Sequence, residues 1–275
     1  MQTLQRTGVD LYVHSNGITL CYDDFGEGTV LVIFIHGFPF EKSSWHSQMG
    51  FFQKTDRVLA YDIRGFGKST IGPERSSINL FADDLIHFMN ALNIKKSIIC
   101  GLSIGGYIAM NAVCRYPGRF KAIILSDTQC IADSNEMKEQ RKETVLNITA
   151  NGLNYFSDEY IKNAFCKETL ETKKELVMEV KEVILSNSPL VITRTLRALA
   201  DRKELCSSLK EISVPGLIIC GREDTITPPS RSEFLCNDIK HSKLQIIENA
   251  GHLPNLEQPD IFNMHLADFL NSLEE

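Results

Sequence analysis

Short apolar runs alternate with longer mixed segments along most of the chain. Six runs of four or five residues are rich in Ile, Val and Leu and carry apolar residues on both faces, at 31–35, 57–61, 97–100, 121–125, 216–220 and 243–247. Apolarity on both faces is typical of parallel strands that helices cover from both sides. The pattern therefore predicts six buried strands of a largely parallel sheet.

Helix-like stretches separate the predicted strands, at 80–92, 106–115, 230–238 and 259–273. Strands and helices that alternate along a chain are typical of a doubly wound α/β sheet. The opening segment, 9–22, has Asn16-Gly17 in its middle, and this dipeptide favours a tight turn between antiparallel strands. We therefore expect a hairpin at one edge of the sheet.

One segment, 131–206, breaks the alternation because it contains no strand-like run and is dense in charged residues. Its apolar residues at 176, 180, 183 and 184 have helical spacing, which predicts an amphipathic helix with a solvated charged face. A helical insertion between two strands is best interpreted as a cap over the carboxyl edge of the sheet, where α/β proteins bind ligands. The predicted division is a core of residues 1–130 and 207–275 with a cap of residues 131–206.

A candidate nucleophile lies between the strand 97–100 and the following helix. The sequence Gly-Leu-Ser-Ile-Gly at 101–105 places Ser103 in a strand–turn–helix corner, where glycines permit a tight turn that exposes the hydroxyl. The N–H of Ile104 then lies at a helix N-terminus and can stabilise an oxyanion. The simpler alternative is a glycine-rich corner with an inert serine.

A base and an acid are expected at the same edge of the sheet. His252 follows the last predicted strand, and Asp224 follows the strand before it. The chain order Ser, Asp, His is the order found in α/β hydrolases. Asp127, which follows the strand 121–125, stays open as the alternative acid, because the geometry of a loop is not legible from its sequence.

The loop after the first parallel strand has the sequence His-Gly-Phe-Pro-Phe at 36–40. In this architecture a backbone N–H from that loop completes the oxyanion hole, and we assign it to Phe38 because Pro39 has no N–H. The side chains of Phe38, Phe40 and Trp45 are candidates for lining an acyl pocket. For Trp45, packing in the core is an equal alternative.

Charge and composition exclude several partners. Lys and Arg number 29 and Asp and Glu 35, giving a net charge of −6 that disfavours nucleic acid and anionic membranes as partners. No apolar run is long enough to span a membrane, and the first residues lack the apolar part of a signal peptide. These features predict a soluble, cytoplasmic protein. The eight cysteines have no zinc-site spacing, so we expect all of them to be reduced and no metal to be bound.

Five blocks of sequence resemble serine members of the α/β-hydrolase superfamily, in the correct order along nearly the whole chain: HGFPF at 36–40, YDIRGFGKS at 61–69, GLSIGG at 101–106, VPGLIICGREDTITPP at 214–229 and ENAGHLPNLEQP at 248–259. The resemblance implies a serine nucleophile, a histidine base, an acid and a lidded pocket, with no cofactor. Asp62 and Arg64 fall in a block that is usually structural in this family.

Departures from the family's subgroups narrow the expected chemistry. Ser103 stands where haloalkane dehalogenases and epoxide hydrolases carry Asp, so these activities are disfavoured. GLSIGG is similar to the corresponding turn of 3-oxoadipate enol-lactonases, and HGFPF is more like that of small carboxylesterases. We therefore expect a serine hydrolase whose substrate is a small or medium carboxylic ester. The alternatives are a lactone hydrolase and a low-turnover ligand sensor on the same fold. The sequence makes no prediction of the oligomeric state.

Overall fold

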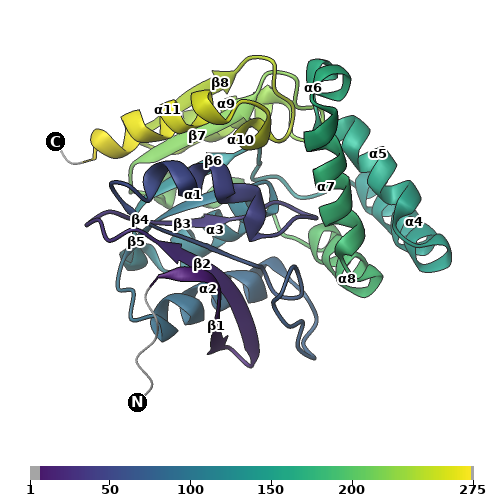
Figure 1. The fold of residues 1–275 in the computed structure, drawn as a ribbon, viewed down its shortest axis with the longest axis horizontal. Coiled ribbons are helices and arrows are strands. Elements are labelled where there is room, and N and C mark those ends of the chain that lie inside the picture. The colour runs from purple at the N-terminus through teal and green to yellow at the C-terminus, as the bar shows by residue number, and fades with distance from the viewer. Residues whose placement is uncertain (1–6, 274–275) are drawn as a thin grey trace.

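The computed structural model of this protein describes residues 7–273 and is built around one eight-stranded sheet (Figure 1). The strand order is β1-β2-β4-β3-β5-β6-β7-β8. The strands are β1 (Gly8–Ser15), β2 (Ile18–Phe25), β3 (Leu31–Ile35), β4 (Arg57–Tyr61), β5 (Ser97–Leu102), β6 (Phe120–Ser126), β7 (Gly216–Gly221) and β8 (Ser242–Ile247). All six strands predicted from apolar runs are confirmed, and they pair in parallel.

The predicted N-terminal hairpin is also confirmed. β1 and β2 pair antiparallel, and β2 pairs antiparallel with β4 at one side of the sheet. Asn16 and Gly17 connect the two strands with φ angles of 49° and 75°. Positive φ at both central residues is what the favoured hairpin turn requires, and Asn-Gly adopts it at low cost.

Helices cover both faces of the sheet because each buried strand presents alternate residues to each side. Val32 and Phe34 of β3 pack in one apolar cluster with α1 (His46–Phe52) and α11 (Pro259–Asn271). Ile33 and Ile35 pack in the opposite cluster. That face is covered by the remaining core helices, α2 (Ile78–Ala91), α3 (Ile104–Arg115) and α9 (Pro229–Asp238).

The strand order reverses next to β3. The chain passes from β3 to β4 on one side and then returns to place β5 on the other side of β3. In open α/β sheets the crevice at such a reversal, outside the carboxyl ends of the strands, is where ligands bind. The loops that follow β3 and β5 therefore lie where a ligand is expected to bind.

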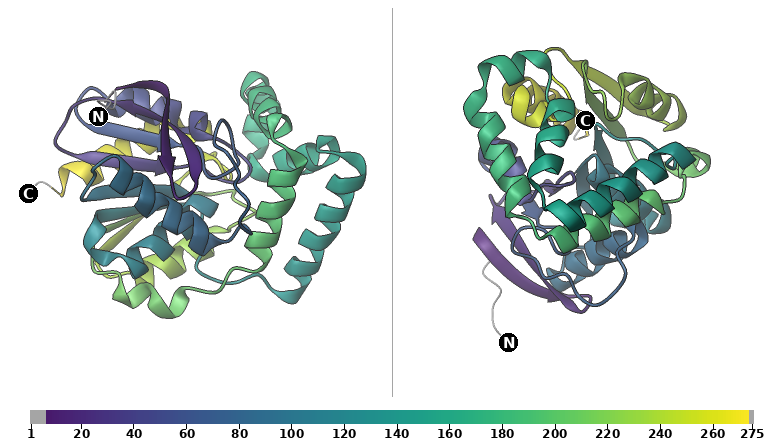
Figure 2. Two further views of the ribbon diagram at one scale, coloured as in Figure 1. Left: turned by 90° about the horizontal axis from the view of Figure 1, so that it is seen from below. Right: turned by 90° about the vertical axis from the view of Figure 1, so that its right-hand side faces the viewer.

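Between β6 and β7 the chain forms five α-helices that stand together at one end of the molecule (Figures 1 and 2). They are α4 (Asn135–Asn151), α5 (Asn154–Ala164), α6 (Lys167–Thr172), α7 (Lys174–Ser186) and α8 (Pro189–Ala200), and we call them the helical segment. The predicted amphipathic helix is α7, with Val180 and Ile184 buried. The backbone N–H of His252 donates to the carbonyl of Ala164, so the segment contacts the carboxyl edge of the sheet. The division of the chain into core and cap domains stays a prediction.

Short helices complete the described residues: η1 (Lys42–Trp45), η2 (Pro117–Arg119), η3 (Cys206–Glu211) and α10 (Pro254–Glu257). No helix within residues 7–273 is long and apolar enough to cross a membrane.

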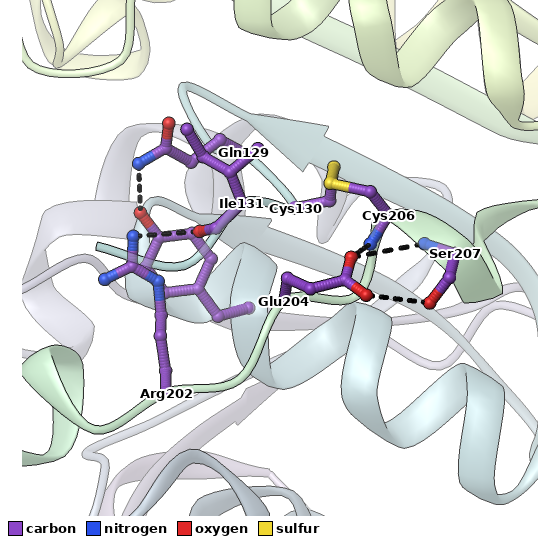
Figure 3. The surroundings of a disulfide bond; sticks show 8 residues. Gln129, Cys130, Ile131, Arg202, Glu204, Cys206 and Ser207 are labelled. Carbon is purple, nitrogen blue, oxygen red and sulfur yellow. Dashed lines mark hydrogen bonds between the residues drawn. A yellow bond between two sulfur atoms is a disulfide. The ribbon is translucent and has the colours of Figure 1, made fainter. Parts of the chain in front are cut away.

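The expectation that all eight cysteines are reduced is wrong for two of them. Cys130 and Cys206 form a disulfide that joins the entry and the exit of the helical segment (Figure 3). The fold brings these two points together, because the N–H of Leu205 donates to the carbonyl of Cys130 at 2.8 Å. The two cysteines are 76 residues apart in sequence, so their spacing gave no sign of the contact. The other six cysteines are free.

Candidate active site

Ser103 occupies a strained turn between β5 and α3. Its φ and ψ are 53° and −112°, which is costly for any residue other than glycine and persists only where neighbouring structure enforces it. Two hydrogen bonds hold the backbone: the N–H of Ser103 donates to the carbonyl of Ser126 at 2.9 Å, and Oγ1 of Thr128 donates to the carbonyl of Ser103 at 2.8 Å. The turn is therefore fixed by the loop that follows β6.

The glycines of the motif are required by close backbone packing. A Cβ on Gly101 would lie 2.3 Å from the carbonyl carbon of Gly105, and one on Gly105 would lie 2.4 Å from the carbonyl oxygen of Ile35. Either contact is far too short, so only glycine lets α3 begin this close to β3 and β5. The strand–turn–helix context predicted for the serine is confirmed.

His252 and Asp224 form a buried pair. Nδ1 of His252 lies 2.8 Å from Oδ2 of Asp224, and neither side chain is exposed to solvent. Three more hydrogen bonds reach Asp224: the N–H groups of Ile226 and Thr227 donate to Oδ1 at 2.8 and 3.0 Å, and the Thr227 hydroxyl donates to Oδ2 at 2.6 Å. Burial alone would raise the pKa of Asp224, but His252 and the Thr227 donors outweigh it and hold the pKa below its ordinary value. Asp224 is therefore an anion that accepts a hydrogen bond from the N–H at Nδ1 of His252.

The other ring nitrogen of His252 has no partner. Nε2 is buried, and no hydrogen bond joins it to Oγ of Ser103 in this structure. It is the one polar side-chain atom of the Asp224–His252 pair left without a hydrogen bond among the described residues. With the ring proton held at Nδ1, the lone pair of Nε2 is available to accept a proton. Hydrogen bonds of this kind are often long in a ligand-free site and tighten when substrate binds.

Asp127, the alternative acid, lies behind this pair and is fully buried. Its Oδ1 accepts a hydrogen bond from the N–H of Gly221 at 2.9 Å, and its Oδ2 lies 2.6 Å from the Ser126 hydroxyl. One polar atom each of Asp127, Asp224 and His252 lies within 4.8 Å of the others. Burial and then the negative charge of Asp224 raise the pKa of Asp127 well above its ordinary range. Of the two candidate carboxylates, Asp224 is the one hydrogen-bonded to the imidazole.

The two backbone N–H groups predicted for the oxyanion hole are unoccupied by protein acceptors. Within the part of the chain that the structure describes, neither Phe38 nor Ile104 donates a hydrogen bond through its backbone. The carbonyl of Phe38 accepts a short hydrogen bond from the hydroxyl of Tyr160 on α5. The Phe38 ring packs against Phe156 and Tyr160 of the helical segment. This makes the loop after β3 a meeting point of sheet and helical segment.

The other aromatic candidates differ in their placement. Phe40 is buried and contacts the ring of Tyr160. Trp45 is fully buried between Phe34 of β3 and Phe262 of α11. Trp45 therefore packs in the core.

His36 holds the same loop in place. Nδ1 lies 2.8 Å from the carbonyl of Gly37 and must donate to it, so Nε2 accepts the N–H of Ile63 at 2.9 Å. Burial lowers the pKa of His36 to about 4, which keeps the ring neutral. Asp62 and Arg64 are structural, as the resemblance implied. Asp62 accepts backbone N–H groups of Lys42 and Lys68, and Arg64 pairs with Asp84 in the interior.

The group formed by Asp127, Asp224 and His252 has the ligand types that a divalent cation prefers. Four hydrogen-bond donors already surround the carboxylate of Asp224, however, and they would oppose a cation at its oxygens. The expectation that no metal or cofactor is needed stays a prediction.

The family model for the alpha/beta hydrolase fold matches residues 30–259. The chain belongs to the α/β-hydrolase family. This α/β hydrolase is 29% identical over 249 residues to 3-oxoadipate enol-lactonase 2 of Acinetobacter baylyi, covering 90% of this chain and 91% of that protein. It is similar to the solved structure of a thermophilic esterase from Thermogutta terrifontis with malate bound, with a TM-score of 0.92, 30% identity, and coverage of 96% and 99% of the two chains.

The structure of the enol-lactonase from Burkholderia xenovorans LB400 shares the fold of this α/β hydrolase, with a TM-score of 0.89, 24% identity and coverage of 94% and 99%.

Sequence reasoning had placed Ser103, His252 and Asp224 at the edge where the structure finds them. It had missed two residues that contact them or their loops: Thr227, which lies inside the 214–229 block, and Tyr160, for which no sequence signal was available in a charged helical region.

Proposed function

We propose that this α/β hydrolase is a serine hydrolase that cleaves small or medium carboxylic esters through an acyl-enzyme intermediate. The observation that carries the proposal is the buried Asp224–His252 pair, whose unpartnered Nε2 belongs to the same sheet edge as the strained turn of Ser103. A neutral imidazole oriented by a carboxylate is what a serine hydroxyl needs in order to lose its proton.

The proposed steps use only groups of this chain. Oγ of Ser103 attacks the ester carbonyl while Nε2 of His252 takes the hydroxyl proton, and the N–H groups of Phe38 and Ile104 stabilise the oxyanion. The tetrahedral intermediate collapses, and the leaving alkoxide departs as an alcohol with the proton from Nε2. Water then attacks the acyl group with His252 again acting as base, which releases the carboxylic acid and regenerates Ser103. Asp224 keeps the proton on Nδ1 and balances the charge of the imidazolium. We propose no cofactor for these steps.

Hydrolysis of a lactone is the second candidate function. A lactone is a cyclic ester, so the same steps apply except that the leaving alkoxide stays attached to the acyl group. The specific observation in its favour is the relationship to 3-oxoadipate enol-lactonase 2 along 90% of this chain. The ester reading is supported in turn by the likeness to the esterase of Thermogutta terrifontis, at 30% identity.

Steady-state turnover tests the proposal. Purified protein is assayed against p-nitrophenyl acetate and butyrate, against simple lactones and against an enol-lactone, with Ser103→Ala as the control. We expect sustained ester hydrolysis with kcat above about 1 s⁻¹, the low end of typical enzymes, and loss of this activity in Ser103→Ala. A single-turnover burst that then stalls would contradict the proposal and favour a ligand sensor. Faster turnover of lactones than of esters would reassign the substrate and leave the nucleophile unchanged.

The cytoplasmic location expected from the sequence stays a prediction. The disulfide between Cys130 and Cys206 opposes it, because such bonds are rare in the reducing cytosol and common in oxidising compartments. Fractionation of cells with thiol trapping of these two cysteines decides between the locations.

A further inference from the structure

Two carboxyl groups meet behind His252, one from the loop after β6 and one from the loop after β7. We propose that Asp127 is protonated and neutral in the folded protein and donates a hydrogen bond to Asp224, which makes it a positioning residue for the acid of the proposed triad. The inference rests on the proposed function for its effect on catalysis, and on the contacts of Asp127 alone for its protonation state.

The hydrogen bonds around the two carboxyls are unequal. Asp224 receives four donors, including Nδ1 of His252, which is suited to a full negative charge. Asp127 accepts only two hydrogen bonds, from the N–H of Gly221 and from the hydroxyl of Ser126, and no Lys or Arg side chain within residues 7–273 forms an ion pair with it. A buried carboxylate with so few donors and no cation is unfavourable.

A carboxyl oxygen of Asp127 lies within 4.8 Å of a carboxyl oxygen of Asp224, with both side chains buried. Two buried carboxylates this close repel strongly when both groups are ionised, so such pairs share one proton. Because Asp224 is the group paired with the imidazole, the proton belongs to Asp127. The pKa of Asp127, raised by burial and by Asp224, and the pKa of Asp224, lowered mainly by His252, point the same way.

The other titratable groups that face this pair do not supply a compensating charge. At the end of β7, burial raises the pKa of the Cys220 thiol to about 12, so it is neutral. From α5, burial raises the pKa of Tyr160 above its ordinary value, so that hydroxyl is also neutral. His252, from the loop after β8, bonds to Asp224 and makes no hydrogen bond to Asp127.

The backbone of Asp127 is built to hold this arrangement. Its φ is 44°, a conformation in which Asp and Asn are enriched among residues other than glycine. Its N–H donates to the carbonyl of Ile219 on β7 at 3.0 Å, so its loop is fixed to the strand that leads to Asp224. Asn can therefore replace Asp127 without changing the local conformation, and its amide retains a donor for Asp224.

The proton on Asp127 has two consequences for the proposed mechanism. It fixes the plane of the Asp224 carboxylate against Nδ1 of His252. It also lowers the basicity of Asp224, so the imidazolium formed during the reaction keeps its proton. Asp127 touches neither Ser103 nor the imidazole through a hydrogen bond, and it acts only through Asp224.

The test compares wild type with Asp127→Asn, which is neutral and keeps a donor, and Asp127→Ala, which is neutral and has none. For ester hydrolysis we expect Asp127→Asn to lose less than about tenfold in kcat, and Asp127→Ala to lose about ten- to a hundredfold with little change in KM, as loss of a hydrogen bond to a charged group predicts. The midpoint of the acid limb of kcat/KM against pH should stay in place in Asp127→Asn, because no charge is removed.

Two activity results would overturn the proposal. If Asp127 were ionised in wild type, Asp127→Asn would delete a negative charge beside the Asp224–His252 pair, and the acid limb would move down by about one pH unit or more. If Asp127→Ala were as active as Asp127→Asn, no donor would be needed at this position.

A second readout needs no activity. Unfolding of wild type must release the proton of Asp127, whereas unfolding of Asp127→Asn does not. The ratio of the unfolding equilibrium constants, wild type over Asp127→Asn, should therefore rise with pH, by up to about tenfold per pH unit, once the pH exceeds the ordinary pKa of an Asp carboxyl. A ratio independent of pH overturns the proposal. If no ester is hydrolysed at all, the proposed function fails, while this measurement still decides the protonation of Asp127.

Discussion

The carboxyl edge of the sheet and the helical segment α4–α8 differ in how their residues are held. At the edge, Ser103, Asp224 and Asp127 follow directly from strands, and hydrogen bonds from neighbouring loops fix their backbones or side chains. The helical segment exposes large apolar side chains, including Leu146 and Tyr155, to solvent. The proposed chemistry therefore uses residues held by the strands and their loops, and the helical segment supplies contacts to those loops.

Several hydrogen bonds, ring contacts and a disulfide join the two regions. The Tyr160 hydroxyl donates to the carbonyl of Phe38, and the amide of Asn187 donates to the carbonyl of Pro39 at 2.9 Å. The carbonyl of Ala164 accepts the N–H of His252. The disulfide closes the base of the segment. Variants at the edge should therefore change the rate strongly, and variants in the helical segment should change stability or substrate binding more than the chemistry.

The largest effect is expected at the edge. Asp224→Asn should lower kcat by about three to four orders of magnitude, because the amide favours the wrong imidazole tautomer. Asp127→Asn is the matched control, in the neighbouring loop, and should cost less than about tenfold. The measurement is kcat for both variants after folding has been verified by circular dichroism. A severe loss at Asp127 with a mild loss at Asp224 would show that the acid has been misassigned.

Removal of the disulfide should affect the helical segment. The double variant Cys130→Ser/Cys206→Ser opens a loop of 76 residues, and loss of that cross-link should lower the free energy of unfolding by about 4 kcal/mol. We expect its kcat to stay close to that of wild type, because the hydrogen bonds that hold Asp127 and Thr128 in the loop after β6 involve neither cysteine. Urea unfolding measures the effect, with Cys114→Ser as the control for loss of a free thiol. An unchanged free energy of unfolding would mean that the segment does not depend on this tie.

The pH dependence of stability should report on the loop after β3. The pKa of His36 is about 4 when folded and about 6.5 ordinarily, so the unfolded chain binds the proton more readily. His36 therefore contributes stability above pH 6.5 that is lost as the pH falls toward 4. The loss between pH 7 and 5 should be about 2 kcal/mol.

Urea unfolding at both pH values tests this, with wild type compared with His36→Gln, in which that part of the loss should disappear. His14→Gln, at an exposed position of β1, is the matched control. Equal losses in wild type and His36→Gln would contradict the neutral, buried state of this ring.

A smaller effect is expected where the helical segment contacts the edge. Tyr160→Phe removes the hydroxyl that donates to the carbonyl of Phe38. The loop that carries the proposed oxyanion donor then loses one tie, and kcat should fall about tenfold. Tyr155→Phe, an exposed tyrosine on the same helix, should have no effect. Steady-state kinetics measure kcat for both variants. Equal kcat values for the two would show that the hydrogen bond from Tyr160 does not affect catalysis.

The contrast between the two regions also sets what the sequence could predict. The positions of Ser103, Asp224 and His252 could be predicted because each residue follows a short apolar strand. The carboxyl ends of parallel strands lie at one edge of the sheet. Their roles stay a prediction until variants are measured. The hydrogen bond from His252 to Asp224, which Asp127 lacks, could not be predicted from the sequence. It depends on a turn that ends at Thr227, whose N–H and hydroxyl also donate to Asp224.

For the helical segment the sequence predicted a cap at 131–206 and one amphipathic helix, but no contact with a particular loop. Tyr160 contacts Phe38 across 122 positions of sequence, and Cys130 contacts Cys206 across 76. Neither contact has a local pattern, since the packing of one helix against a distant loop depends on the whole fold. The spacing of apolar residues did predict the buried face of α7, where Val180 and Ile184 are buried.

Covalent labelling tests the central claim most directly. An organophosphonate ester reacts with a serine hydroxyl that an adjacent base has activated, and peptide mass mapping then locates the label. We predict one label per chain, on the peptide that contains Ser103, and no label in Ser103→Ala. His252→Ala, which removes the proposed base, should be labelled far more slowly than wild type. A label on another residue, or none on folded wild-type protein, would contradict the assignment of Ser103 as the nucleophile.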